Sequence, residues 1–316
     1  MFSYILRRVL YTIPIALGVT LICFLLVQLG PGDPLNALLP EDASQATIDR
    51  MKAEYGLDKP LPIQYVTWLG KALSGDLGYS IATGRSVSAE ISSALGNTLM
   101  LAFGGMLVSF ILGLVLGSIA GSRPGSIADR IVTGIAVAGV SVPHYWIAIV
   151  LVAIFSVGLG WLPAMGMGPR GSSSFAFDWA HIQHLVLPIF ALSLIPTGII
   201  ARSVRGAVSE TYGQDFVQTL RAKGLPERQV FTHVARNACG SAVAVMGLQM
   251  ADLLGGSILV ETVFVWPGTG LLLNNAIFMR DLPILQGTIL VLALIFVATN
   301  LVADILQTLL DPRIRR

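Results

Sequence analysis

Six long apolar stretches run through this chain and restrict what it can fold into. Four contain no Asp, Glu, Lys or Arg, and these are Val9–Leu29, Thr98–Ala120, Ile131–Val157 and Leu185–Ala201. Two more contain a single acidic residue each (Asp252 and Asp304), and these are Ser241–Val260 and Ile284–Leu309. Because a helix needs about 20 apolar residues to cross a bilayer, the sequence predicts an all-α membrane protein with six transmembrane helices.

The composition excludes the soluble and nucleic-acid-binding classes. Only 12% of the residues are charged and 54% are apolar, with a mean hydropathy of +0.75. Soluble domains carry about 25% charged residues. The net charge of +2 is too small to indicate a nucleic-acid partner. The two cysteines, Cys23 and Cys239, lie far apart in or beside apolar segments, which indicates free, packed thiols rather than a disulfide framework.

The distribution of basic residues predicts how the chain is oriented. If the N-terminus is cytoplasmic, the cytoplasmic segments hold 13 of the 20 Lys and Arg residues. The short outside loops then hold only Arg170 and Arg280. Since cytoplasmic loops carry the excess of positive charge, we expect both termini inside. The first apolar run is 21 residues long with no A-x-A site after it, so it is predicted to be a retained signal anchor.

The spans divide the chain into an N-terminal segment with the first helix (1–29), an outside loop (30–97), a membrane core (98–309) and a cytoplasmic tail (310–316). In the outside loop, helix-like stretches at Ala46–Tyr55 and Pro62–Leu73 predict a small ordered cap after the first helix. A second outside loop, Gly158–His184, is rich in Gly and Ser.

The longest cytoplasmic loop, residues 202–238, carries the clearest local pattern. We expect a helix at Val208–Ala222, a break at residues 223–226, and an amphipathic helix at Glu227–Asn237. Gly224 suits a helix C-terminus and Pro226 suits the first turn of the next helix. This pattern is typical either of a surface that docks a partner or of a loop that covers helix ends.

Motifs for catalysis and metal binding are missing from the sequence. There is no G-x-x-x-x-G-K-[ST] phosphate cradle, so we do not expect the chain to hydrolyse ATP. The G-x-G-x-x-G at residues 166–171 lies in a loop without a strand before it, and His181 and His184 have no carboxylate partner in the motif. We therefore predict no catalytic residues and no metal site.

Polar and helix-breaking residues within the spans are candidates for a pathway or for packing. They are Pro143, His144, Asp252, Gly255 and Gly256. An acidic residue in a membrane is costly and is a functional candidate by default. Asp304, near the cytoplasmic end, is more typical of a structural role. Neither Asp252 nor Asp304 has a basic partner in another span, which argues against a proton relay.

A series of short motifs gives the chain a family resemblance. In order, they are Pro31–Pro34, Tyr55–Pro60, Gly75–Gly78, Gly160–Pro163, Leu254–Ile258, Trp266–Gly270 and Asp311–Arg313. With this order and spacing, the chain resembles the inner-membrane permease subunits of bacterial ABC importers for peptides, nickel and related solutes. It is most similar to the B-type permeases of dipeptide, oligopeptide and glutathione systems, and the resemblance runs almost end to end.

Within the cytoplasmic loop, Arg221-Ala222-Lys223-Gly224 followed by Arg236-Asn237-Ala238 resembles the EAA loop, which in this family docks into a groove of an ATPase subunit. The chain departs from that pattern at Gln218-Thr219-Leu220, where the family has E-A-A, and at Ser241, where a proline is common. The resemblance implies that the ATPase-coupling residues are Asp215, Gln218, Arg221, Ala222, Lys223, Gly224, Arg236 and Asn237. We expect Arg221 and Lys223 to pair with acidic residues of the ATPase, and Gly224 to allow close backbone approach.

The resemblance also implies a type I importer architecture in a bacterial inner membrane, with residues 98–309 as the permease core. The implied partners are a second homologous permease in a heterodimer, two P-loop ATPase subunits that bind ATP and Mg, and an outside solute-binding protein. The chain itself would hold no cofactor. We expect breaks at Pro143, Pro188 and Pro196 to bend the pathway helices.

Short peptides are the first expectation for the cargo, followed by glutathione-like peptides, opines, nickel complexes and oligosaccharides. An ion-coupled secondary transporter remains as an alternative, but it should show paired intramembrane charges and inverted repeats. A membrane enzyme should show a catalytic constellation near an interface. Neither pattern is visible in the sequence.

Overall fold

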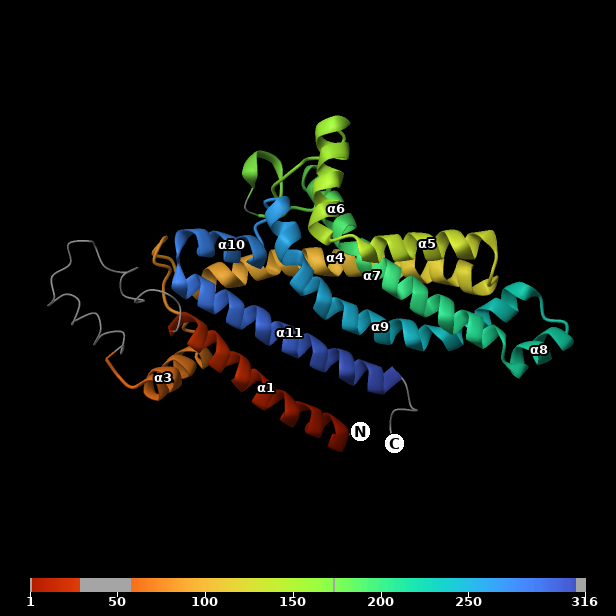
Figure 1. The fold of residues 1–316 in the computed structure, drawn as a ribbon, viewed down its shortest axis with the longest axis horizontal. Coiled ribbons are helices and arrows are strands. Elements are labelled where there is room, and N and C mark those ends of the chain that lie inside the picture. Colours follow the sequence, from red (N-terminus) through yellow and green to blue (C-terminus); the bar gives the residue numbers. More distant parts are fainter. Residues whose placement is uncertain (1, 29–57, 173, 311–316) are drawn as a thin grey trace. The chain divides into compact units, whose positions relative to one another are not determined.

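The computed structural model describes residues 2–28, 58–172 and 174–310. The regular secondary-structure elements of these residues are all helices (Figure 1). In chain order they are α1 (Phe2–Gln28), α3 (Leu61–Leu73), α4 (Val87–Ser122), α5 (Ile127–Ser141), α6 (His144–Leu151), the π-helix η2 (Val152–Gly158), the short 3₁₀ turn η3 (Pro169–Gly171), α7 (Trp179–Tyr212), α8 (Asp215–Ala222), α9 (Glu227–Val263), α10 (Thr269–Met279) and α11 (Leu282–Leu310). The all-α prediction is confirmed for these residues.

The chain forms two compact units. One contains Thr98–Pro267 together with the chain from Thr299, and the other contains Phe2–Asn97 and Gly268–Ala298. The helix predicted at 46–55, the first motif of the resemblance and the C-terminal motif lie outside the described residues, as does the side chain of Cys239. Cys23 is a free, buried thiol, as expected.

Four of the described helices are long and apolar enough to cross a membrane. They are α1 over Leu6–Leu25, α4, α7, and α11 over Leu282–Ile305. A fifth span is possible if α5 and the helix that starts at His144 count as one. The predicted span 241–260 lies inside α9, where several side chains are outside the described set. Six spans therefore remain a prediction, whereas an integral membrane protein with apolar helices is what the structure supports.

The span expected at 131–157 is two helices that meet at an angle of 102°. The break falls at Val142 and Pro143, where it was predicted. Proline has no N–H, and its ring pushes the preceding residue out of the helical region. Val142 accordingly has φ −109° and ψ 129°. The carbonyl of Pro143 then accepts the first bonds of α6, from the N–H groups of Trp146 and Ile147.

The two other predicted breaks do not interrupt their helix. Pro188 and Pro196 are both buried within α7, which continues through them from Trp179 to Tyr212. Side chains of neighbouring helices reach carbonyls of this region. Ser109 Oγ donates to the Ser193 carbonyl at 3.0 Å. Helix α7 is therefore continuous where the sequence alone indicated a break.

A ladder of glycines brings α4 very close to α7. Cβ atoms built at Gly113, Gly117 and Gly121 would lie within 2.7 Å of α7 atoms, and at Gly117 the contact is the Ala201 carbonyl oxygen at 2.5 Å. A Cβ at Gly198 of α7 would lie 2.6 Å from the Ala136 carbonyl oxygen of α5. Small residues at four-residue spacing allow such backbone contact between membrane helices. Helix α7 also packs along α9 and α6 (Figure 1).

In the other unit, the described part of the predicted cap is ordered. The hydroxyl of Thr20 in α1 and that of Tyr65 in α3 are 2.7 Å apart, and Phe24 packs against the Tyr65 ring. The carboxylate of Asp281, 3% exposed, accepts hydrogen bonds from Ser80 Oγ at 2.5 Å and from two backbone N–H groups of residues 81–82. This carboxylate fixes the loop before α4 to the turn between α10 and α11. The extracytoplasmic location of the cap stays a prediction.

The glycine ladder predicts opposite effects for two Gly→Ala substitutions. Gly117→Ala places a methyl group against a backbone carbonyl and should lower the free energy of unfolding by about 1–3 kcal/mol, the usual cost of overpacking. Gly206→Ala, on α7 where a Cβ meets nothing within 4 Å, should be neutral or stabilising by up to about 1 kcal/mol. Thermal unfolding in detergent measures both. Equal melting temperatures for the two variants would contradict the close contact.

Candidate functional site: the helical hairpin around α8

The predicted coupling loop folds into a compact hairpin of helices. Helix α7 ends at Tyr212, the short helix α8 follows, and α9 begins at Glu227 after Pro226. The single helix expected at Val208–Ala222 is therefore wrong, because the chain turns at Gly213 and Gln214. Gln214 has an extended conformation (φ −79°, ψ 148°). Two signals could have shown this turn: a glycine after a helical run, and an acidic residue, Asp215, in the first turn of the next helix.

Apolar side chains of α8 pack this short helix against α7 and α9. Val217 is completely buried. It belongs to the same hydrophobic cluster as Val208 of α7 and Val230 and Val234 of α9, with Leu220 packed against that cluster. Burying a valine side chain contributes about 1.5–3 kcal/mol. The hairpin is therefore a packed element of defined shape, and a change in the position of α8 is felt by both α7 and α9.

The tip of the hairpin depends on Gly224. Its φ of +77° lies in the left-handed region, which glycine adopts without steric cost. The Gly224 N–H donates to the Arg221 carbonyl at 2.9 Å, and the Leu225 N–H donates to the Leu220 carbonyl at 3.2 Å. A Cβ at Gly224 would meet nothing within 4 Å. Within this chain, glycine is required for the backbone conformation and not for a close contact.

A bidentate ion pair braces the same tip. Arg221 Nε lies 2.7 Å from Glu227 Oε1, and Arg221 Nη2 lies 3.2 Å from Glu227 Oε2. The guanidinium also lies 5.7 Å from the centre of the Tyr212 ring. This hydrogen-bonded guanidinium holds the pKa of Glu227 below its usual value. Arg221 was expected to pair with a partner's acid, whereas in this structure its acidic partner is within the chain.

The other predicted coupling residues lie on the outside of the hairpin. Asp215, Gln218, Ala222, Lys223 and Gly224 are all exposed, and so are Arg236 and Asn237 on α9. The structure thus brings the first five together on one short helix and its tip. Arg236 and Asn237 lie in the third turn of α9, where Asn237 donates to the His233 carbonyl at 2.8 Å. Docking by these residues stays a prediction.

The candidate pathway residues separate into packed and exposed groups. His144 Nδ1 lies 3.3 Å from the Ala191 carbonyl oxygen, and a Cβ at Gly256 would lie 3.1 Å from the His144 ring. His144 and Gly256 therefore lie against each other, and their assignment to packing stays a prediction. Asp252 and Gly255 are exposed on α9, and Asp252 accepts a hydrogen bond from Gln249 at 3.2 Å.

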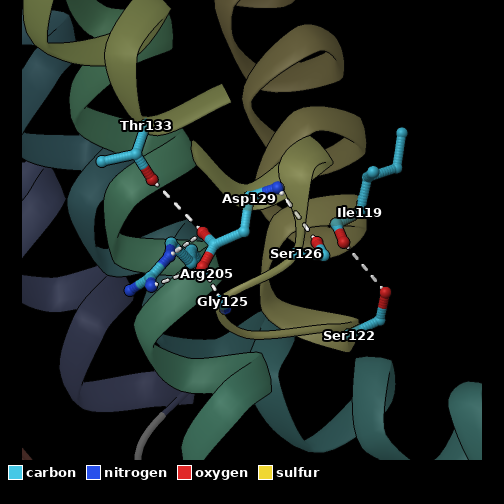
Figure 2. Close-up of polar contacts among 7 residues, drawn as sticks. All are labelled: Ile119, Ser122, Gly125, Ser126, Asp129, Thr133 and Arg205. Atoms are coloured by element: carbon cyan, nitrogen blue, oxygen red, sulfur yellow. Dashed lines mark hydrogen bonds and ion pairs between the residues drawn. The ribbon is translucent and has the colours of Figure 1, made fainter. Parts of the chain in front are cut away.

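Sequence analysis missed a polar cluster at the turn between α4 and α5 (Figure 2). The carboxylate of Asp129, a residue that is 3% exposed, accepts three hydrogen bonds. The donors are Arg205 Nε at 2.5 Å, Arg205 Nη2 at 2.9 Å and the Gly125 N–H at 2.8 Å. Ser126 caps α5 by accepting from the Asp129 N–H at 3.2 Å. The pattern Ser126-x-x-Asp129 signals a helix start, but the partner 76 residues away has no local signal.

Comparison with known proteins covers almost the whole chain. Residues 113–316 match a family described as "Binding-protein-dependent transport system inner membrane component", and residues 1–102 match the model for the N-terminal part of such components. The oligopeptide transport system permease protein AppB of Bacillus subtilis is 36% identical over 99% of both chains. The dipeptide transport system permease protein DppB of Alkalihalophilus pseudofirmus is 38% identical over 100% of both chains.

A solved structure supports the fold. The MetNI methionine ABC transporter, in inward-facing conformations, matches with a TM-score of 0.53 and 17% identity. The match covers 71% of this chain and 96% of that chain. At this identity the likeness concerns the fold alone, and it agrees with the type I permease architecture expected from the sequence.

The brace between Arg221 and Glu227 predicts a pH-dependent tip. Because the pKa of Glu227 is lower in the folded hairpin than in a free chain, the contact is complete above the ordinary glutamate pKa of about 4.3 and is lost as the pH falls through the lowered value. Hydrogen-exchange protection factors of residues 223–225 should fall over that range. Glu227→Gln should give low protection at every pH. Equal pH dependence in the two proteins would contradict the brace.

Proposed function

The chain belongs to the family of binding-protein-dependent transport system inner membrane components, and we propose that it is the permease subunit of an ATP-driven importer of peptides. The observation that carries this proposal is its full-length similarity to permeases of oligopeptide and dipeptide transport systems. The family is a component of transport systems. In this proposal, ATP and Mg bind to separate P-loop ATPase subunits, and the permease supplies movement rather than catalysis.

The rest of the assembly follows from the same proposal. The permease pairs with a second, homologous permease, and each contributes six spans to a central pathway. Both termini lie in the cytoplasm of a bacterial cell, and the chain crosses the inner membrane. A solute-binding protein delivers the peptide to the outside loops. The loop fixed by Asp281 supports this part of the proposal, because an ordered outside surface can be recognised by a second protein.

The hairpin of α8 is the element that receives the ATPase. The helix has a buried face at Val217 and an exposed face with residues between Asp215 and Gly224, and a docking helix needs both. The tip also carries the exposed Arg221–Glu227 pair, which occupies the Arg221 guanidinium within the chain. Direct contact with the ATPase is therefore left to Gln218, Ala222 and Lys223, and Arg221 positions them.

Movement of the ATPases then reaches the membrane through rigid helices. Val217 of α8 belongs to one hydrophobic cluster with residues of α7 and α9. Helix α7 is continuous over 34 residues and α9 over 37 residues. A displacement of α8 would be carried as a rigid-body movement of both helices, which is a common form of switching between states. The glycine contacts with α4 and α5 extend the moving group to those helices.

One face of α9 is suited to line the pathway. Leu248, Asp252, Gly255 and Leu259 are exposed at spacings of three and four residues, so they share a single side of the helix. An acidic group within a membrane protein belongs next to water or an opposite charge. We assign Asp252 and Gly255 to the interface between the two permeases, where a peptide passes, and His144 and Gly256 to packing behind it.

The proposal is tested by purifying the tagged full chain gently from its native membrane and identifying its companions by mass spectrometry. A second permease of this family and one or two P-loop ATPases would support it. The complex, reconstituted with its binding protein, should then take up labelled peptides only when ATP is present. A stable chain that is isolated without any ATPase, and uptake driven by an ion gradient alone, would overturn the proposal in favour of a secondary transporter.

Substitutions at Gly224 separate the role of the tip from that of folding. Gly224→Leu forces a branched residue into the left-handed region, at a cost of roughly 1–2 kcal/mol, and should distort the docking surface. We expect normal membrane insertion, ATP hydrolysis that no longer depends on peptide delivery, and uptake reduced at least tenfold. Gly224→Asn is the matched control, because asparagine tolerates this conformation. It should retain most of the uptake, and equal loss in both variants would contradict the conformational role.

A further inference from the structure

A surface groove lies beside α5 and has no role in the function proposed above. Its volume is about 590 Å³, and it is lined by Asp129, Arg130, Thr133, Gly134, Val137 and Ala138 of α5 and by Arg205 of α7. All of these residues belong to one compact unit. The groove begins at the polar cluster of Figure 2 and follows α5 away from the turn that precedes it.

The polar end of the groove carries one unbalanced positive charge. The buried carboxylate of Asp129 is directed at Arg205 and neutralises it through two hydrogen bonds from Nε and Nη2. The Arg205 side chain also lines the groove and is 36% exposed. Arg130 is exposed, and within the part of the chain that the structure describes no carboxylate forms an ion pair with it. An anion of single charge would complete this end.

The remainder of the groove is apolar and open. A Cβ built at Gly134 would meet nothing within 4 Å, and Val137 is 47% exposed. From Arg130 to Ala138 the helix rises about 12 Å. Since the apolar span begins directly after Arg130, charged groups lie where the chain leaves the membrane and apolar groups lie deeper. The order of polarity along the groove is that of a lipid molecule.

We propose that this groove binds one anionic phospholipid. Its phosphate would contact Arg130 and the outer nitrogens of Arg205, and one acyl chain would lie along Gly134, Val137 and Ala138. Basic pockets between membrane helices select anionic headgroups, and each cation near the surface contributes about fivefold in affinity. Asp129 acts by orienting Arg205 and does not itself contact the lipid. This site does not depend on which solute the protein carries.

The charge argues for a lipid rather than a neighbouring protein helix. An apolar helix could fill the groove beside Gly134, but it would bury the charge of Arg130 without a counter-charge. Burying an unpaired charge is costly in free energy. A phosphodiester supplies that charge and an acyl chain together. A bound lipid would also bridge α5 and α7 beside the pair that already joins them, so it would stabilise these two helices in an anionic bilayer.

Native mass spectrometry of the delipidated complex, or of the full chain if it is isolated alone, tests the site by titration with phosphatidylglycerol and, separately, with phosphatidylcholine. We expect one tightly bound phosphatidylglycerol and weaker phosphatidylcholine. Arg130→Gln should weaken the phosphatidylglycerol affinity about fivefold. Gly134→Leu should fill the apolar part of the groove and weaken the phosphatidylglycerol affinity at least as much. Arg123→Gln, an equal change of charge on the preceding turn outside the groove, should leave the affinity unchanged.

Three outcomes would overturn the proposal. Equal effects of Arg130→Gln and Arg123→Gln would show that the charge attracts lipid without a defined site. Displacement of the lipid by millimolar inorganic phosphate would show that only an anion is bound and that the apolar part of the groove holds no chain. A photo-reactive residue at position 134 that labels a second polypeptide, and no lipid, would identify the groove as a protein interface.

Discussion

Backbone contact between α7 and its neighbours is the constraint on which the described membrane core depends. At Gly117 and Gly198 there is no room for a side chain, since a Cβ would lie 2.5 Å and 2.6 Å from carbonyl oxygens of the adjacent helices. Apolar side chains gain little by association in lipid, so close approach and polar contacts must hold membrane helices together. The Asp129–Arg205 pair adds a polar contact between α5 and α7 (Figure 2).

This arrangement connects the packing to the proposed mechanism. Helix α7 passes through two prolines without a break and ends at the hairpin, so its membrane part and its docking part are one element. The hairpin in turn divides its residues between two tasks. Arg221, Glu227 and Gly224 determine the shape of the tip, whereas Gln218, Ala222 and Lys223 present the surface. In the proposed mechanism, the shared hydrophobic cluster of α7, α8 and α9 would carry a displacement of α8 to both long helices.

Local sequence signals predicted the elements that depend on local physics. The α3 helix, the break at Pro143 and the turn at Gly224 follow from apolar periodicity and from the backbone limits of proline and glycine. Helix lengths were underestimated, because an apolar window marks the hydrocarbon layer and not the helix. Helix α4 accordingly starts at Val87 rather than Thr98.

Features that depend on distant residues could not be predicted from the sequence. The partner of Asp129 is 76 residues away, and nothing in the local pattern distinguishes Arg205 from the other basic residues of the segment 202–238. The continuity of α7 through Pro188 and Pro196 was also not predicted, because a proline within a helical pattern favours a break. Arg221 carried a family motif, yet its role as an internal brace needed the position of Glu227.

Site-specific photocross-linking in the intact complex tests the central claim most directly. A photo-reactive residue in place of Lys223, at the exposed tip of the hairpin, should form an adduct with a P-loop ATPase subunit. The same residue in place of Lys71, which is predicted to lie on the outside, should form none. An ATPase adduct from Lys223 alone is the result that this account predicts. No ATPase adduct from Lys223, or equal adducts from both positions, would contradict it.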